Sequence, residues 1–125
     1  MQGKEPAVNK SRLLAIASYV VAALFLLTGS AKFLMGQASL DQFEGWGYPP
    51  WFAYVTGALE LAAAVLLAIR STRFYGAVLG AVIMIGAALT HLKEPEIGLL
   101  PLGIPMLAAC VWIAWSLRPG KNHDA

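Results

Sequence analysis

The sequence contains few charged residues. Of its 125 residues only 13% are charged, whereas 58% are hydrophobic. Soluble domains have about 25% charged and about 45–50% apolar residues. The formal net charge is +2, and the basic residues form no dense patch of the kind that binds nucleic acid. The composition therefore predicts a single lipid-exposed domain with no nucleic-acid partner.

Reactive side chains are also scarce. A single cysteine, Cys110, excludes an intrachain disulfide, and no Cys/His set has the spacing of zinc ligands. Because Cys110 lies in an apolar run, we expect it to act as a small buried or lipid-facing hydrophobe. The sequence lacks a haem-ligand pair, a nucleotide-binding loop and a nucleophile–base arrangement. An ancillary role is therefore favoured over a complete enzyme, and no metal site is expected.

Four long apolar segments are present, at residues 13–33, 51–69, 74–92 and 99–117. Each is close to the roughly 20 residues that a helix needs to cross about 30 Å of hydrocarbon. Backbone polar groups find no water in that region, so the segments should be helical. The sequence predicts an all-α integral membrane four-helix bundle, formed by one domain over residues 1–125.

The first segment has a competing interpretation as a cleaved signal peptide. Lys10 and Arg12 would supply its basic start, and the small residues at positions 28–31 would supply a cleavage site. However, the apolar stretch exceeds the usual length of the hydrophobic region of a signal peptide, and three further spans follow it. A permanent span is therefore favoured.

The distribution of lysine and arginine predicts the orientation of the spans. Seven of the nine basic residues lie on one side of the predicted bundle, while the other side holds Lys93 and, at its edge, Lys32. By the positive-inside rule both termini should be cytoplasmic. The residues on the basic side are Lys4, Lys10, Arg12, Arg70, Arg73, Arg118 and Lys121.

The connection from Leu34 to Pro50 is long enough to hold a short interfacial helix. Ser39 and Gln42 have the spacing of a capping box, which predicts that this helix begins at Ser39. Pro50 suits the first turn of the second span, where its missing N–H costs nothing.

Gly76 and Gly80 have the spacing of a helix-contact motif in the third span. Two interpretations are open. The favoured one is tight packing within a single bundle, and the other is a homo-oligomer formed through this face.

An ionisable side chain in a membrane costs about 2.5–3.5 kcal/mol on insertion scales, so each one requires an explanation. Three occur here: Lys32, Glu60 and His91. At 1.5 Å per residue, Glu60 lies about 14 Å below the outer boundary, and Lys32 and His91 lie about 28 Å and 25 Å above the inner one. Helical side chains lean toward the N-terminus, and the second span runs opposite to the first and third. The three groups should therefore point to a common level in the outer half.

Three threonines accompany these groups. Two precede a charged residue by four positions and so share its helix face, and the third adjoins the histidine. Their hydroxyls either complete a polar cluster or, as is favoured, bond to carbonyls of their own helices. They are Thr28, Thr56 and Thr90.

Two roles for the cluster remain open. In the structural one, Glu60 pairs with Lys32 or His91 and fixes the register of the helices. In the functional one, the cluster binds a polar headgroup such as a quinone ring, or relays protons. A lone histidine at the membrane edge, such as His91, is more often a packed residue than a ligand.

The polar residues and the glycines around them resemble the DoxX-like family of small bacterial membrane proteins over residues 13–117. The resemblance implies a four-helix membrane bundle in the bacterial cytoplasmic membrane, an association with membrane oxidoreductases and quinone, and a site lined by Lys32, Glu60 and His91. The matching residues are Gly29-Ser30-Ala31-Lys32-Phe33, Phe43, Gly47-Tyr48-Pro49, Gly57, Glu60, Ala87, Thr90-His91 and Pro101.

Two functions are thus in competition. One is a quinone- or small-molecule-binding ancillary subunit of a membrane oxidoreductase system. The other is a non-catalytic membrane scaffold, or a carrier of a small hydrophobic solute. Because the chain has no cysteine pair, any thiol redox step would require a partner protein.

Overall fold

The computed structural model describes residues 9–93 and 100–119, without the side chains of residues 91 and 100–102. Within this part of the chain the fold is all-helical, with no strand. The four predicted apolar segments are helices whose observed ends differ from the predicted ones by at most three residues. The elements are α1 (Lys10–Leu34), α2 (Gln37–Gly45), α3 (Phe52–Ala68), the 3-10 turn η1 (Arg70–Thr72), α4 (Arg73–Lys93) and α5 (Leu100–Leu117).

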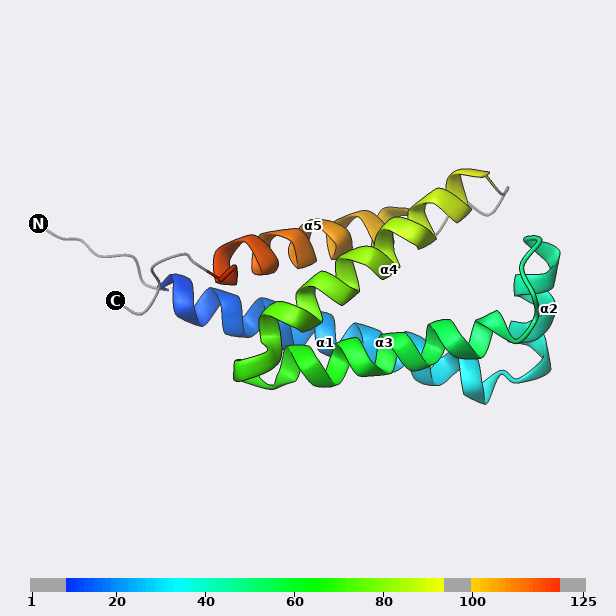
Figure 1. Cartoon of the computed structure of the whole chain (residues 1–125), viewed down its shortest axis with the longest axis horizontal. Helices are drawn as coiled ribbons and strands as arrows, with labels where there is room; N and C mark the ends of the chain where they lie inside the picture. Colours follow the sequence, from blue (N-terminus) through cyan, green and yellow to red (C-terminus); the bar gives the residue numbers. More distant parts are fainter. Residues whose placement is uncertain (1–8, 94–99, 120–125) are drawn as a thin grey trace, which may run out of the picture.

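The four long helices run along the long axis of the molecule (Figure 1). α1 packs beside α3, α3 beside α4, and α4 beside α5, with a smaller contact between α5 and α1. α2 lies across the far ends of α1 and α3, and α4 diverges from α3 as it leaves η1 (Figure 1). The molecule thus has an α2 end and an opposite end that holds η1, the start of α1 and the end of α5.

We call the opposite end the basic end, because five of the described basic residues lie there. They are Lys10, Arg12, Arg70, Arg73 and Arg118. Arg73 is buried, with 5% of its surface exposed. Its Nε donates to the carbonyl of Leu67 at 2.9 Å, and its guanidinium lies 5.2 Å from the ring centre of Tyr19. Arg73 therefore binds the last turn of α3 instead of facing solvent.

The core lies where α1, α3, α4 and α5 meet. Phe25, Leu67 and Ile113 are fully buried there, together with Cys110, as the sequence predicted for this cysteine. A side chain at Gly80 would come within 2.8 Å of the Phe25 ring and 2.9 Å of the Cys110 sulfur. Glycine is therefore required where α4 meets the core.

The two glycines of the third apolar segment both face into the bundle. A Cβ atom at Gly76 would lie 2.6 Å from the backbone nitrogen of Leu67, so α4 begins in direct contact with the end of α3. Gly76 and Gly80 are both buried by their own chain. The positions of both glycines therefore agree with the favoured interpretation, tight packing within a single bundle.

The expected helix in the first long connection is present as α2, but its predicted start is wrong. It begins at Gln37, after Gly36, whose φ of 55° is a conformation that glycine adopts readily. Ser39 lies inside the helix and is buried instead of capping it. Backbone reversal at Gly36, and not a capping hydroxyl, sets the start of α2.

The outer surface of the bundle is apolar. Large hydrophobic side chains on α1, α3, α4 and α5 are exposed, including Leu27 at 67% and Val82 at 60%. Residues 10–34 and 70–90 are long and apolar enough to cross a membrane, whereas residues 52–68 and 103–117 form shorter apolar helices. Length and apolarity thus support two of the four predicted spans directly.

Candidate functional site

Lys32 and Glu60 form an ion pair between α1 and α3. The Lys32 Nζ donates to the Glu60 Oε1 at 3.0 Å. The two helices approach closely beside the pair, because a Cβ at Gly29 would come within 2.9 Å of the Gly57 carbonyl oxygen. The glycines place the two backbones near enough for the lysine to reach the carboxylate. The structure thus brings together two of the three predicted charged residues.

The Glu60 side chain is 5% exposed and that of Lys32 21%. The Thr28 hydroxyl lies 3.4 Å from the carbonyl of Phe25 and is also within reach of the Glu60 carboxyl group. Its single proton can be donated to either oxygen. Both interpretations of Thr28, own-helix bonding and cluster membership, are therefore compatible with its position.

Thr90 contacts the connection between α2 and α3. Its Oγ1 donates to the carbonyl of Gly86 at 2.9 Å, as was favoured for these threonines. The Tyr48 hydroxyl lies 2.7 Å from the Thr90 Oγ1. Because the threonine proton is directed to Gly86, Tyr48 is the donor in this second bond. The bond joins the connection after α2 to α4, at the end where α3 and α4 diverge.

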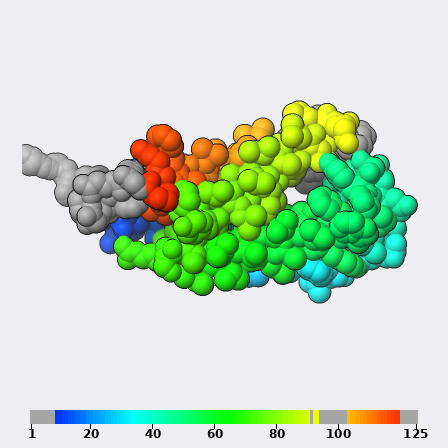
Figure 2. All heavy atoms as spheres, in the orientation of Figure 1, coloured from blue at the N-terminus to red at the C-terminus, as the bar shows by residue number. Residues whose placement is uncertain are grey.

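A cavity of about 440 Å³ lies between these two sets of contacts. Figure 2 shows the surface hollowed between α4 and the α2 end of the molecule. Polar groups on its wall come from α1, α2, the connection after α2, α3 and α4, and the remainder of the lining is largely apolar. The polar lining residues are Lys32, Gln42, Tyr48, Thr56, Glu60 and Thr90.

The cavity opens sideways between α3 and α4. Leu59 and Val82 both line it and are 40% and 60% exposed on the outside of the bundle. Gly86 also lines it, and a Cβ there would meet no atom within 4 Å. The opening therefore lies on the apolar flank of the bundle, away from the ends of the helices.

An aromatic group closes the cavity at the α2 end. Phe43 packs against Trp46, Tyr48 and Phe52, with ring centres 5.1–6.2 Å apart. The Lys93 Nζ lies 5.4 Å from the ring centre of Tyr48. α2 and the connection after it thus cover this end of the cavity.

The residues of this site differ in part from those predicted for the polar cluster. Thr56 lines the cavity as expected of a cluster residue. His91 belongs to α4, but its side chain lies outside the described residues. Tyr48 was not predicted as a site residue but assigned to a family motif, and Gln42 was assigned to a capping box. Their positions depend on the path of an irregular connection, for which a single sequence carries no periodic signal.

The model of the DoxX-like family matches residues 16–114. The chain belongs to the DoxX-like family. It is accordingly a membrane protein of the DoxX type, whose surroundings are a lipid bilayer. No curated protein and no solved structure matches this DoxX-like chain. The residues of the ion pair, the cavity and the Tyr48–Thr90 bond all lie within the matched range.

In this DoxX-like protein the candidate site places polar groups around an apolar space. Among the described residues no group of three or more His, Cys, Asp or Glu side chains could hold a metal ion. The wall of the cavity offers an ammonium, a carboxylate, hydroxyls and an amide around an apolar space. Such a wall suits a largely apolar molecule with one hydrogen-bonding end.

Proposed function

We propose that this DoxX-like protein is a multi-pass protein of the bacterial cytoplasmic membrane, with both termini in the cytoplasm. Its cavity binds a small, largely apolar molecule that carries a hydrogen-bonding ring, of the quinone class. The protein would serve as an ancillary subunit of a membrane oxidoreductase system, with the redox chemistry supplied by its partner.

Four spans are supported by the exposed surface of the bundle. α3 has 17 residues and α5 has 18, at the lower end of the range of about 17–25 for a membrane helix. In the most apolar stretch of α1 only 33% of the residues are buried, and in that of α4 only 28%. Helices this apolar and this exposed match a bundle whose outer solvent is lipid.

The cavity beside the Lys32–Glu60 pair is the observation that carries the binding proposal. Its volume of about 440 Å³ falls in the range of about 300–1,000 Å³ for small-molecule sites. The Lys32 ammonium has three N–H donors and one of them is directed to Glu60. A quinone carbonyl is an acceptor that the remaining donors would satisfy, while the lining residues Leu79, Ile83 and Ala87 would contact the ring and tail.

The competing function is a non-catalytic scaffold or a carrier of a small hydrophobic solute. The observation in its favour is that Glu60 and Lys32 already satisfy each other across α1 and α3. In that case the pair fixes the register of the helices, and the cavity needs no polar ligand.

Phenylalanine at Gly86 tests the binding proposal. Gly86 lines the cavity and has open space for a side chain, so Gly86→Phe should fill the opening without disturbing the core. The matched control is Gly103→Phe in α5, which also has open space but does not line the cavity. Binding of ubiquinone-1 to the detergent-solubilised protein is measured by equilibrium dialysis.

The expected result is at least tenfold weaker binding by Gly86→Phe and unchanged binding by Gly103→Phe. Glu60→Gln should also weaken binding, since it removes the carboxylate that orients Lys32. If wild type and Gly86→Phe bind ubiquinone-1 equally, the cavity is not the quinone site, and the scaffold or carrier function is favoured.

A further inference from the structure

A second depression lies between α4 and α5 near the basic end, away from the Lys32–Glu60 pair. It has a volume of about 330 Å³ and is open along the surface of the bundle. We call it the α4/α5 groove. Its wall is apolar except at one end, where Arg118 closes it. Its lining includes Phe74, Val78, Ala81, Val111, Trp115 and Arg118, together with Ala114 and with Val82, which also lines the cavity beside Lys32.

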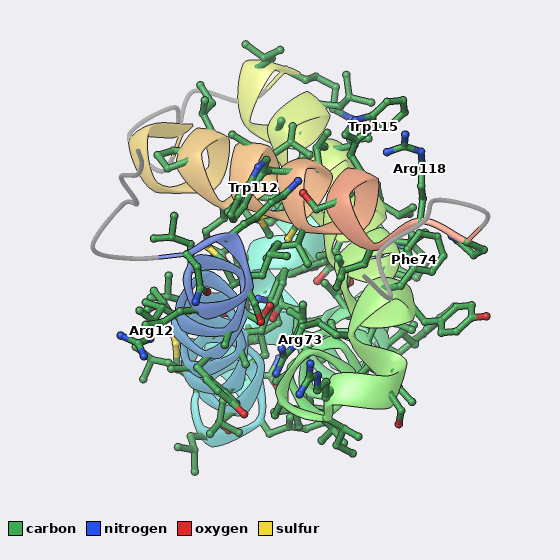
Figure 3. All side chains as sticks on the ribbon, turned by 90° about the vertical axis from the view of Figure 1, so that its left-hand side faces the viewer. Arg12, Arg73, Phe74, Trp112, Trp115 and Arg118 are labelled. Atoms are coloured by element: carbon green, nitrogen blue, oxygen red, sulfur yellow. The ribbon has the colours of Figure 1, made fainter. Side chains whose placement is uncertain are left out.

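Arg118 is held in a fixed position at the end of this groove. Its Nη1 donates to the carbonyl of Trp115 at 2.6 Å, and its guanidinium stacks 3.7 Å from the centre of the Trp115 ring. A guanidinium has five N–H donors, and this hydrogen bond uses one. Figure 3 shows Arg118, Trp115 and Phe74 on the same side of the basic end.

The charges around the groove favour an anion. The basic end carries five described cations, whereas the described acidic residues Asp41, Glu44 and Glu60 all lie on α2 or α3, away from it. Planar guanidinium groups bind phosphate oxygens in pairs, which makes arginine well suited to a phosphate group.

An apolar groove that ends at an arginine matches the shape of a phospholipid. Val78 and Val111 are 40% and 52% exposed, and they offer an acyl chain a surface on α4 and α5. Arg118 and Trp115 lie where the phosphate would sit, since tryptophan and arginine both prefer the level of the headgroups. Inorganic phosphate would use the arginine but would leave the apolar wall unoccupied.

We propose that the α4/α5 groove is a specific binding site for an anionic phospholipid, with the phosphate on Arg118 and one acyl chain between α4 and α5. The inference rests on the proposed placement of the basic end at the cytoplasmic face of the membrane. It does not depend on what the cavity beside Lys32 binds.

Native mass spectrometry of the full chain tests the proposal. The protein is extracted from vesicles of equal parts phosphatidylglycerol and phosphatidylethanolamine, and the lipid retained by each variant is counted. Arg118→Gln should lower the ratio of bound phosphatidylglycerol to phosphatidylethanolamine about fivefold, the effect of one cation near an anionic surface. Arg12→Gln is the matched control, because Arg12 is an exposed arginine of the same end that does not line the groove.

A second measurement separates a lipid site from a phosphate site. Added phosphatidylglycerol should raise the melting temperature of wild type and Arg12→Gln more than that of Arg118→Gln. The proposal is overturned if Arg118→Gln retains as much phosphatidylglycerol as Arg12→Gln, or if inorganic phosphate stabilises the protein as well as the lipid does. Ubiquinone-1 binding by Arg118→Gln should equal that of wild type, so failure here and failure of the quinone proposal are distinguishable.

Discussion

The Lys32–Glu60 pair joins two side chains that are each expensive to place in a membrane. Buried ion pairs contribute little net stability, because desolvation offsets the attraction between the charges. Removing one partner is much more costly, since it leaves the other charge unpaired in an apolar surrounding. A structural pair and a binding pair can therefore be separated by comparing single with double substitutions.

A double-substitution cycle makes this comparison. Lys32→Met alone should destabilise the protein by about 3–5 kcal/mol, because Glu60 is only 5% exposed and loses its partner. Lys32→Met combined with Glu60→Leu should recover most of that loss. Chemical unfolding in bicelles measures both. Wild-type stability for Lys32→Met alone would show that the pair does not hold α1 against α3.

At the residue scale, the meeting of Lys32 with Glu60 was predictable. Helix direction and a rise of 1.5 Å per residue are sufficient to place both groups at one level. The bond between Tyr48 and Thr90 was not predictable in this way. It depends on how the connection between α2 and α3 turns back over the bundle, and no repeating pattern constrains that path.

At the scale of elements, the junction between α3 and α4 is held by side-chain bonds to the end of α3. The Thr72 hydroxyl donates to the carbonyl of Leu66 at 2.9 Å, and Arg73 donates to that of Leu67. The last carbonyls of a helix have no partner within the helix, so these side chains satisfy the end of α3. The turn therefore fixes the angle at which α4 leaves.

Arg73→Gln should lower the stability of the protein by about 1.5–3 kcal/mol, the usual contribution of a hydrogen bond to a charged group. Arg70→Gln, in the same turn, should have little effect, because Arg70 is exposed. Thermal unfolding of the two variants gives the comparison. Equal melting temperatures for Arg73→Gln and Arg70→Gln would contradict the assigned role of Arg73.

Apolar length identifies all four long helices, but it does not determine how their ends are built. The sequence pattern places Arg73 among the charges of a loop, whereas its side chain folds back and is buried against α3. The predicted start of α2 was wrong because a Ser–Gln pair imitates a capping box, while backbone reversal at Gly36 comes earlier in the chain.

At the scale of the whole molecule, the proposed orientation is argued from the asymmetry of charge. Five described cations lie at one end, and the α2 end carries both Asp41 and Glu44. Under the positive-inside rule we expect the basic end to face the cytoplasm. The single native cysteine, Cys110, is fully buried, so it should not react with polar thiol reagents and need not be removed.

Two single-cysteine additions test this orientation. Glu44→Cys on α2 should react with a membrane-impermeant maleimide in intact spheroplasts. Ser71→Cys in η1 should react only after the membrane is permeabilised. Both residues are exposed on the protein, so a difference in labelling reports the side of the membrane. The opposite pattern would show that the orientation is the reverse of the proposed one. Equal labelling would place α2 and η1 on the same side of the membrane.

The hydrogen bonds that hold the turn at η1 bear on the size of molecule that the proposed binding site can hold. Thr72 and Arg73 bind α4 to the end of α3 at η1. If the two helices separate, the distance between them should therefore increase toward Tyr48 and Thr90. In the proposed binding site a bulkier ring would displace the far half of α4, while α1 and α3 would keep their register through Gly29 and Gly57. For the proposed binding site, we therefore expect the hydrogen bond between Tyr48 and Thr90 to limit the size of the ligand.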